Sequence, residues 1–427
     1  MTAIFLMYLA QIFWFSKAWR LSGPVRLPFK LLLRCLLGAA ALILLATGID
    51  PVFVRFLPVQ GFTDWALAVS RAWLFASSLG LLAIVTVRLI AKLVTLLSSA
   101  RGPKCGSTYG AIGRPNQGRR RFLRYGVFLA GSAPFMASAY GFASRLRFHV
   151  NEIEVPVAGL PPKLDGMRIA QISDIHIGDF MPFAQLRHAV EMTNRLHPDL
   201  TVITGDFISW KGDPLKDCIS ELSRLRAPMG VWGCNGNHEG YANAEHLSQV
   251  LFHRYGMRLL RSQNAVLERN GERLNLIGVD YQRQRDSSGT QPQMLAGIES
   301  LVRKDMPNIL LSHNPNSFYR AAELGIELSL AGHTHGGQIQ IDLAGDKLSP
   351  AVFYTKFVAG MYQLPFGKQK EYPSSPASGP FENKTVQPGK NKKPSAILYV
   401  NRGLGTIWIP VRLGVPPEIT VFTLRRA

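Results

Sequence analysis

The chain has 427 residues and a formal net charge of +20, most of which belongs to its N-terminal third. Residues 1–143 contain sixteen Lys and Arg but only two acidic residues, whereas the remainder contains 32 basic and 26 acidic residues. A soluble nucleic-acid-binding protein carries such an excess in a folded domain, but here it lies between long apolar segments, as in the cytoplasmic loops of membrane proteins. No nucleic-acid partner is therefore expected. The four cysteines lack CxxC spacing, which argues against a zinc knuckle and a disulfide framework.

Four apolar segments near the N-terminus are interpreted as membrane spans. They comprise residues 2–15, 31–49, 65–87 with a continuation to 97, and 125–142. The second and third approach or exceed the ~20 residues that a helix needs to cross a bilayer, whereas the first is short enough to be only an anchor. Basic residues follow the first span and precede the fourth, while the loop between the second and third holds only Arg55. Because basic loops stay in the cytoplasm, we expect a multi-pass bacterial inner-membrane protein whose C-terminal domain lies outside the cytoplasm.

The linker before the fourth span contains the sequence RRRFLRYGVFLAG. This stretch resembles the twin-arginine export signal of bacteria, with Arg119 and Arg120 as the arginine pair. Its internal position departs from that pattern, and a positively charged cytoplasmic anchor is an equal alternative. The expected organisation is residues 1–100 as transmembrane helices, 101–147 as a basic linker with the fourth span, and 148–427 as a catalytic domain. Small residues up to Ala139 also permit signal-peptidase cleavage, which we consider the lesser alternative.

A local pattern recurs five times after Met167: an apolar run ends in small and polar residues that can bind metal. The five stretches are MRIAQISDIH, LTVITGD, GVWGCNGNHE, NILLSHNP and LSLAGHTHGG. Runs this apolar indicate strands that are covered on both faces, and the stretches 183–196 and 217–225 have helical spacing. In an α/β sheet, sites collect beyond the carboxyl ends of strands, so these five ends are expected to converge.

The residues at the five strand ends carry oxygen or imidazole nitrogen and no thiolate. They are Asp174, His176, Asp206, Asn237, His238, His313, His333 and His335. Such ligands suit Mn, Fe or Zn. Eight groups exceed the need of one ion and indicate a centre of two divalent metal ions, for which Asp206 is the candidate bridge.

The ordered series D-x-H, G-D, G-N-H-E, a lone His and G-H-T-H resembles the calcineurin-like metallophosphoesterase superfamily over roughly residues 165–425. Within it, GHTHGGQI and the C-terminal stretch beginning YVNRGLG resemble the YkuE-like, membrane-associated bacterial branch. The resemblance implies an α/β fold, a four-layered α/β/β/α sandwich with a dinuclear site on its loops.

The resemblance also implies a role for each of these residues. The first metal takes Asp174, His176, Asp206 and His335, and the second takes Asp206, Asn237, His313 and His333. His238 is the catalytic residue that is not a ligand, and a metal-bridging hydroxide is the nucleophile. Arg402 is a candidate to bind phosphate, with an ordinary ion pair as its rival.

The segment 363–395 is rich in Pro, Ser, Gly and Lys, and is expected to be a mobile insertion. The leading function is a membrane-anchored phosphoesterase that hydrolyses a phosphodiester or pyrophosphate in an envelope or lipid-linked substrate. One alternative is a hydrolase of a nucleotide-linked lipid precursor at the cytoplasmic face. Another is a protein that uses the metal site to bind the envelope without turnover.

Overall fold

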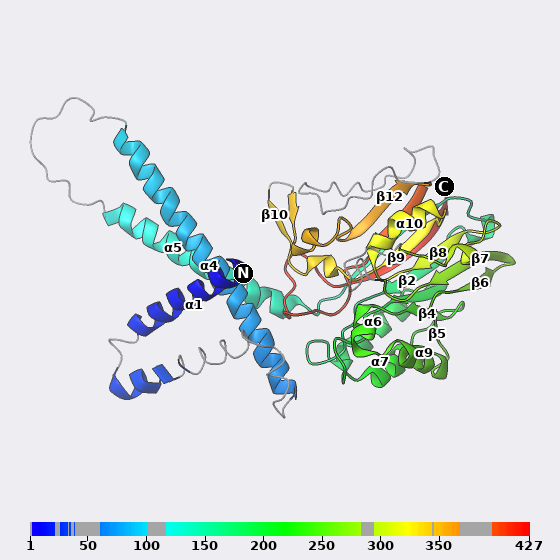
Figure 1. Cartoon of the computed structure of the whole chain (residues 1–427), viewed down its shortest axis with the longest axis horizontal. Helices are drawn as coiled ribbons and strands as arrows, with labels where there is room; N and C mark the ends of the chain where they lie inside the picture. The colour runs from blue at the N-terminus through cyan, green and yellow to red at the C-terminus, as the bar shows by residue number, and fades with distance from the viewer. Residues whose placement is uncertain are drawn as a thin grey trace, which may run out of the picture. The chain divides into compact units, whose positions relative to one another are not determined.

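The computed structural model describes residues 2–21, 26–32, 34, 35, 38, 60–100, 117–282, 294–343, 346–367 and 395–427. The chain forms two compact units, Met1–Phe142 and Ala143–Ala427 (Figure 1). Most of the second predicted span and residues 368–394 of the predicted insertion lie outside the described residues. The insertion's first residues, 363–365, belong to a strand of the second unit.

The first unit contains the helices α1 (Thr2–Leu21), α4 (Gln60–Ala100) and most of α5 (Gln117–Ser144). Two stretches, Trp65–Leu97 and Tyr125–Ser144, are long and apolar enough to cross a membrane. Glycine allows α4 and α5 to approach closely, because a Cβ atom at Gly80 would lie 2.7 Å from the carbonyl oxygen of Gly131. Close contact through small residues is typical of helices that pack inside a bilayer.

The second unit contains two six-stranded sheets. The first has the order β1-β14-β2-β3-β4-β5 and the second β12-β13-β9-β8-β7-β6. The bounds of the first sheet are β1 His149–Val157, β2 Arg168–Ile172, β3 Leu200–Thr204, β4 Val231–Cys234, β5 Arg258–Leu259 and β14 Glu418–Arg426. Those of the second are β6 Gln263–Arg269, β7 Glu272–Gly278, β8 Asn308–Leu311, β9 Leu328–Ala331, β12 Gly360–Pro365 and β13 Ser395–Val400. Strands β2 to β5 are parallel, as are β7 to β9 with β13.

Short helices cover the outer faces of the two sheets (Figure 1). They are α6 Phe183–Arg195, α7 Leu215–Leu222, α8 Asn237–Ala242, α9 Glu245–Arg254 and α10 Phe318–Glu323. The single-turn 3-10 helices are η1 Pro162–Leu164, η2 Glu299–Leu301, η3 Pro315–Ser317, η4 His335–Gly337 and η5 Pro350–Phe353. Strands β10 (Ile341–Leu343) and β11 (Asp346–Leu348) form a separate antiparallel hairpin.

Three apolar clusters fill the interfaces between these layers. The first joins Ile172 and Ile203 of the first sheet to Leu186 and Ile219 of the helices α6 and α7. A second cluster lies between the two sheets, and a third joins the second sheet to Phe318 of α10. Each fully buried Leu, Ile or Phe side chain contributes roughly 1.5–3 kcal/mol to the hydrophobic stabilisation. The layer order is therefore α/β/β/α, as the family resemblance implied.

Candidate metal centre

All five apolar runs that the sequence singled out are strands, and their carboxyl ends lead into one site. β2, β3 and β4 of the first sheet and β8 and β9 of the second precede the predicted residues directly. The two sheets touch at this point, where Gln171 donates a hydrogen bond from Nε2 to the carbonyl oxygen of Ala331, 3.0 Å away. The site is therefore built by both sheets together.

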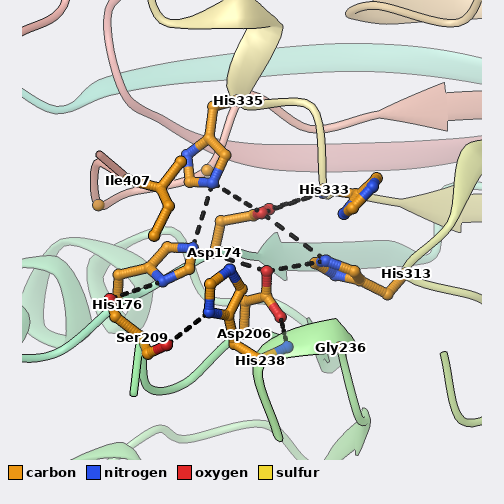
Figure 2. A network of polar contacts seen from close by, with 12 residues as sticks. Asp174, His176, Asp206, Ser209, Gly236, His238, His313, His333, His335 and Ile407 are labelled. Carbon is orange, nitrogen blue, oxygen red and sulfur yellow. Dashed lines mark hydrogen bonds and ion pairs between the residues drawn. The ribbon is translucent and has the colours of Figure 1, made fainter. Parts of the chain in front are cut away.

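The structure brings seven of the eight predicted residues together in three overlapping groups, each able to present its ligand atoms within 4.8 Å of one another. These groups are Asp174, His176 and His335; His176, Asp206 and His238; and Asp206, His313 and His333. Figure 2 shows their side chains pointing toward a common centre. The eighth residue, Asn237, is buried at the start of α8, next to His238.

In the first group, two histidine rings face one another and a carboxylate. The Nε2 atoms of His176 and His335 lie 3.1 Å apart. The Oδ1 atom of Asp174 lies 3.3 Å from His335 Nε2, and Asp206 Oδ2 lies 3.6 Å from His176 Nε2. Burial lowers the pKa of His176 to about 3, so its imidazole is neutral and retains a lone pair for a cation.

In the third group, the tautomer of His313 requires a proton or a metal ion beside its Nε2 atom. Its Nδ1 atom lies 2.5 Å from the carbonyl oxygen of Thr204 and must donate the hydrogen bond. The Nε2 atom of a neutral ring then presents a lone pair to Asp206 Oδ2, which lies 3.0 Å away. Two acceptors at this distance repel each other unless a proton or a metal ion lies with them.

The pKa of His313 in this third group also indicates a positive charge at this place. Burial alone would lower the pKa of His313, but the carboxylates of Asp206 and Asp174 outweigh it and raise this pKa to about 10. The Oδ1 atom of Asn237 is also buried without a hydrogen-bond partner, which is unusual for an amide oxygen inside a protein. Both features, and the oxygen and nitrogen donors, fit divalent metal ions.

The backbone at the site is held in an uncommon conformation. Asp174, His176, Asp206, His333 and His335 all have positive φ, between 48° and 75°. The left-handed region costs a residue other than glycine of the order of 1–2 kcal/mol. These five residues, all Asp or His, thus share a strained backbone geometry that the surrounding fold must maintain.

Two glycines make room for the carboxylates. A Cβ atom at Gly236 would lie 2.1 Å from Asp206 Oδ1, and one at Gly332 would lie 2.3 Å from Asp174 Oδ2. Contacts this short do not occur in folded proteins, so any larger residue would displace a carboxylate. The GNHE and GHTH motifs therefore require glycine at these positions, because a carboxylate oxygen occupies the place of a Cβ atom.

Glu239 is a site residue for which the sequence reasoning assigned no role. Its buried carboxylate accepts hydrogen bonds from the backbone N–H groups of Asp206 (2.9 Å), Phe207 (2.8 Å) and Gly236 (2.8 Å). Burial, and then the charge of Asp206, raise the pKa of Glu239 to about 7. Glu239 thereby fixes the turn that carries Asp206, and its only sequence signal was its place in the GNHE motif.

A loop between β13 and β14 supports the site from the other side. Arg412 is 2% exposed and donates hydrogen bonds to the carbonyl oxygens of Arg402 (2.8 Å) and Gly403 (3.1 Å). The next glycine, Gly405, donates its N–H to the carbonyl oxygen of Asp174 at 2.7 Å. No motif or pattern in the sequence indicates that Arg412 is buried.

The sequence allows two roles for Arg402, binding of a phosphate group or an ordinary ion pair. Its Nε atom lies 2.6 Å from Oε2 of Glu418, whose side chain is buried. Its backbone N–H also donates to Oε1 of Glu418 at 2.9 Å. The structure favours the ion pair.

His238 lies at the edge of the centre. Its Nδ1 atom is 2.6 Å from the carbonyl oxygen of Ser209, so that nitrogen donates and Nε2 is left for another partner (Figure 2). Its ring lies edge-on to His176, with a centroid distance of 4.8 Å. Whether His238 binds metal or acts on substrate stays a prediction, because it also belongs to one of the three groups.

Residues 167–337 match the family model described as calcineurin-like phosphoesterase. The Bacillus subtilis (strain 168) protein named uncharacterized metallophosphoesterase YkuE is 31% identical over 319 residues, which cover 72% of this chain and 97% of that protein. A Bos taurus transmembrane protein with metallophosphoesterase domain is 30% identical, covering 65% of this chain and 57% of its own length. The UDP-2,3-diacylglucosamine pyrophosphatase LpxG of Chlamydia trachomatis (serovar D) is 27% identical, covering 61% of this chain and 85% of that protein.

Proposed function

Because this chain belongs to the calcineurin-like phosphoesterase family and is a metal-dependent hydrolase, we propose that it is a membrane-anchored enzyme with two metal ions. Its reaction is the hydrolysis of a phosphodiester or a pyrophosphate. Its substrate belongs to the cell envelope or is linked to a lipid. The catalytic unit acts outside the cytoplasm, at the inner membrane of a bacterium.

The arrangement of Asp206 is the observation that carries the proposal. Its Oδ2 atom faces His313 at 3.0 Å and His176 at 3.6 Å, so one carboxylate stands between the two ligand groups. Asp174, His176 and His335 would hold one ion, and Asn237, His313 and His333 the other, with Asp206 shared. Two bound divalent ions, of Mn, Fe or Zn, supply a water of lowered pKa and stabilise negative charge on the phosphoryl oxygens.

The chain's own residues have separate tasks around that chemistry. Glu239 holds the turn of Asp206 through three backbone N–H groups, and Arg412 holds the loop behind Asp174. In its doubly protonated form, His238 can donate the proton on Nε2 to the leaving oxygen, since its Nδ1 proton is committed to the carbonyl oxygen of Ser209. A positioned proton donor of this kind typically contributes about 10²–10⁴-fold in rate.

Membrane anchoring and a lipid-linked substrate are supported by independent observations. Two helices are long and apolar enough to cross a membrane, and the bovine relative is named a transmembrane protein. The name of the chlamydial relative describes a substrate that combines a nucleotide with an acylated sugar. A catalytic unit tethered to a bilayer meets such a substrate at high local concentration.

A substrate screen tests the activity. The detergent-purified full chain, loaded with Mn, is assayed against phosphate monoesters, diesters and pyrophosphates, including lipid-linked ones. We expect turnover of diesters or pyrophosphates, and none by the Asp206→Ala variant prepared in the same way. Metal binding without turnover of any ester would instead support the envelope-binding alternative.

Cysteine labelling tests the topology. Cys218 and Cys234 are fully buried, so in a Cys35→Ser background Cys105 is left as the native reporter of the basic linker. A Tyr354→Cys substitution adds a reporter to the catalytic unit at a side chain that is 79% exposed. In intact spheroplasts an impermeant maleimide should label the introduced cysteine and spare Cys105. The reverse pattern would support the cytoplasmic hydrolase of a nucleotide-linked lipid precursor.

A further inference from the structure

Three aromatic side chains form a connected group at His238 and have no part in the chemistry described so far: two contact His238, and the third contacts one of those two. The rings of Trp210 and Tyr241 contact the His238 imidazole edge-on, with centroid distances of 5.7 and 5.3 Å. The ring of Trp408 contacts Trp210 at 6.4 Å, at an interplanar angle of 80°. We call Trp210, Tyr241 and Trp408 the aromatic rim. They come from the loop after β3, from α8 and from the loop before β14.

Two members of the aromatic rim have more than half of their surface exposed to solvent. Tyr241 is 57% exposed and Trp408 is 61% exposed. Trp408 also has a φ of 67°, which is a genuine outlier for so bulky a residue. A strained backbone conformation of this kind persists only where the surrounding structure enforces it, and residues in such conformations are concentrated at functional sites.

The neighbours of Trp408 explain how the strained residue is held in place. Ile407 donates its N–H to Gln338 Oε1 at 2.7 Å and accepts from Gln338 Nε2 at 2.8 Å. Figure 2 shows the Ile407 side chain pointing toward His176. The backbone of the loop that carries Trp408 is therefore bound to the segment that follows His335, which belongs to the metal centre.

The position of the aromatic rim indicates what it binds. His238 directs Nδ1 to Ser209, so Nε2 is the atom that can reach the leaving oxygen of a bound ester. Whatever is bonded to that oxygen must lie against the residues that surround the imidazole, and two of these are Trp210 and Tyr241. We propose that the aromatic rim is the subsite for the leaving group, and that this group presents a ring with a flat apolar face. This inference rests on the proposed function.

The shape of the rim favours a ring over an acyl chain. Its members meet at interplanar angles of 70° to 80° and leave more than half of Tyr241 and Trp408 open to solvent. A flexible chain is removed from water only in an enclosed groove. A rigid ring gains from stacking on a single exposed aromatic face, as nucleobases do on open protein surfaces.

The test compares leaving groups of similar acidity and different ring area. Methyl p-nitrophenyl phosphate and methyl 4-methylumbelliferyl phosphate are assayed with the Mn-loaded full chain in detergent. We expect kcat/KM to favour the umbelliferyl ester by about tenfold, and this preference to disappear in Trp408→Ala and Tyr241→Ala. Tyr354→Ala, which removes an aromatic side chain of similar exposure that has no ring contact with His238 among the described residues, should keep the preference.

A matched decyl ester and a binding measurement complete the test. If Trp408→Ala impairs the decyl ester more than the umbelliferyl ester, the subsite takes acyl chains and the ring assignment is wrong. Equilibrium dialysis of 4-methylumbelliferone decides the subsite without turnover: binding should weaken about tenfold in Trp408→Ala, and equal binding overturns the proposal. Absence of hydrolysis with every metal, together with normal ring binding, would defeat the proposed function but not the subsite.

A glycine variant separates binding from a structural role of Trp408. Because glycine adopts positive φ without strain, Trp408→Gly should keep or raise the thermal midpoint while it abolishes the umbelliferyl preference. A fall in the thermal midpoint together with an unchanged preference would assign Trp408 to the fold and overturn its place in the subsite.

Discussion

The helical unit and the catalytic unit differ in how far they expose large apolar side chains. In the helical unit Leu82 and Leu89 are 61% and 62% exposed, while Gln11 and Ser77 are 7% and 0% exposed. In the catalytic unit Phe207 and Phe318 are completely buried. Large apolar side chains exposed in this way, on a helix that includes one of the two stretches long and apolar enough to cross a membrane, are typical of a surface that faces hydrocarbon.

The two units also treat their buried polar groups differently. In the helical unit Gln11 donates to Ser77 Oγ at 2.9 Å and accepts from Trp73 Nε1 at 2.8 Å, so the interior network is satisfied. In the catalytic unit Asn237 Oδ1 and His313 Nε2 are buried without a hydrogen-bond partner. Unsatisfied polar atoms are expensive in a protein interior, and those near the five strand ends mark the place where metal ions are expected.

The largest predicted effect comes from removing the shared carboxylate. Asp206→Ala should lose about two equivalents of metal and nearly all activity, because neither ligand group keeps its geometry without the bridge. The loss should exceed the roughly 10⁴-fold that a single proton donor contributes. Elemental analysis of the purified protein and initial rates with bis(p-nitrophenyl) phosphate measure both quantities.

The Asp206→Ala variant also tests whether the helical unit is independent of the metal centre. The helical unit contains no residue of the metal centre, so the amount of Asp206→Ala recovered in the membrane fraction should equal that of the parent chain. Loss of one equivalent of metal, with the other retained, would transfer the bridging role to another residue.

The second prediction separates metal binding from catalysis within the centre. His238→Ala should keep both ions and lose about 10²–10⁴-fold in kcat, or roughly 3–5 kcal/mol, because only a proton donor is removed. The loss should shrink for esters with good leaving groups, which need less protonation. Elemental analysis and a series of esters measure this; a variant that sheds metal would show that His238 is a ligand.

Glu239 gives the third and smaller effect. Glu239→Gln replaces one of two acceptor oxygens by an amide that cannot accept from Asp206 N–H, Phe207 N–H and Gly236 N–H together. Loss of such a supporting contact typically lowers metal affinity by about 10–100-fold. Titration with Mn should detect the change.

A matched control for Glu239 lies at the second sheet. Glu327 accepts a backbone N–H from Asn308 at 2.8 Å, and it belongs to none of the three ligand groups. Glu327→Gln should therefore leave Mn affinity unchanged. Equal metal affinity in both variants and the parent chain would assign Glu239 to folding alone.

Sequence reasoning was most successful where the signal is local. The five apolar runs before the predicted ligands are all strands, and the helices predicted over 183–196 and 217–225 appear as α6 (Phe183–Arg195) and α7 (Leu215–Leu222). Because parallel strands present their carboxyl ends at one edge, the convergence of the site residues followed from the strand pattern.

The features that escaped prediction depend on distant partners. The donors that Glu239 binds at Asp206 and Phe207 are more than thirty positions away in the chain. Asp and His adopt positive φ more often than most residues other than glycine, but still uncommonly, so their presence did not indicate which backbone positions, such as Asp174 and His335, would have it. The pairing of Arg402 with Glu418 likewise needed the register of β14.

The smallest predicted effect concerns the helical unit and leaves the catalytic unit unchanged. Gln11→Leu keeps the approximate volume of the side chain but leaves the Trp73 Nε1 donor without its partner. Polar contacts between membrane helices contribute about 0.6–2 kcal/mol, so the thermal midpoint in detergent should fall slightly. Ile12→Leu, at a neighbouring position that is 67% exposed, should not change it. Both variants should hydrolyse bis(p-nitrophenyl) phosphate at the parental rate, because that substrate does not depend on the membrane. A stable Gln11→Leu variant with a parental midpoint would show that the polar network does not hold α1 against α4, whereas a loss of hydrolysis would mean that the two units are energetically coupled.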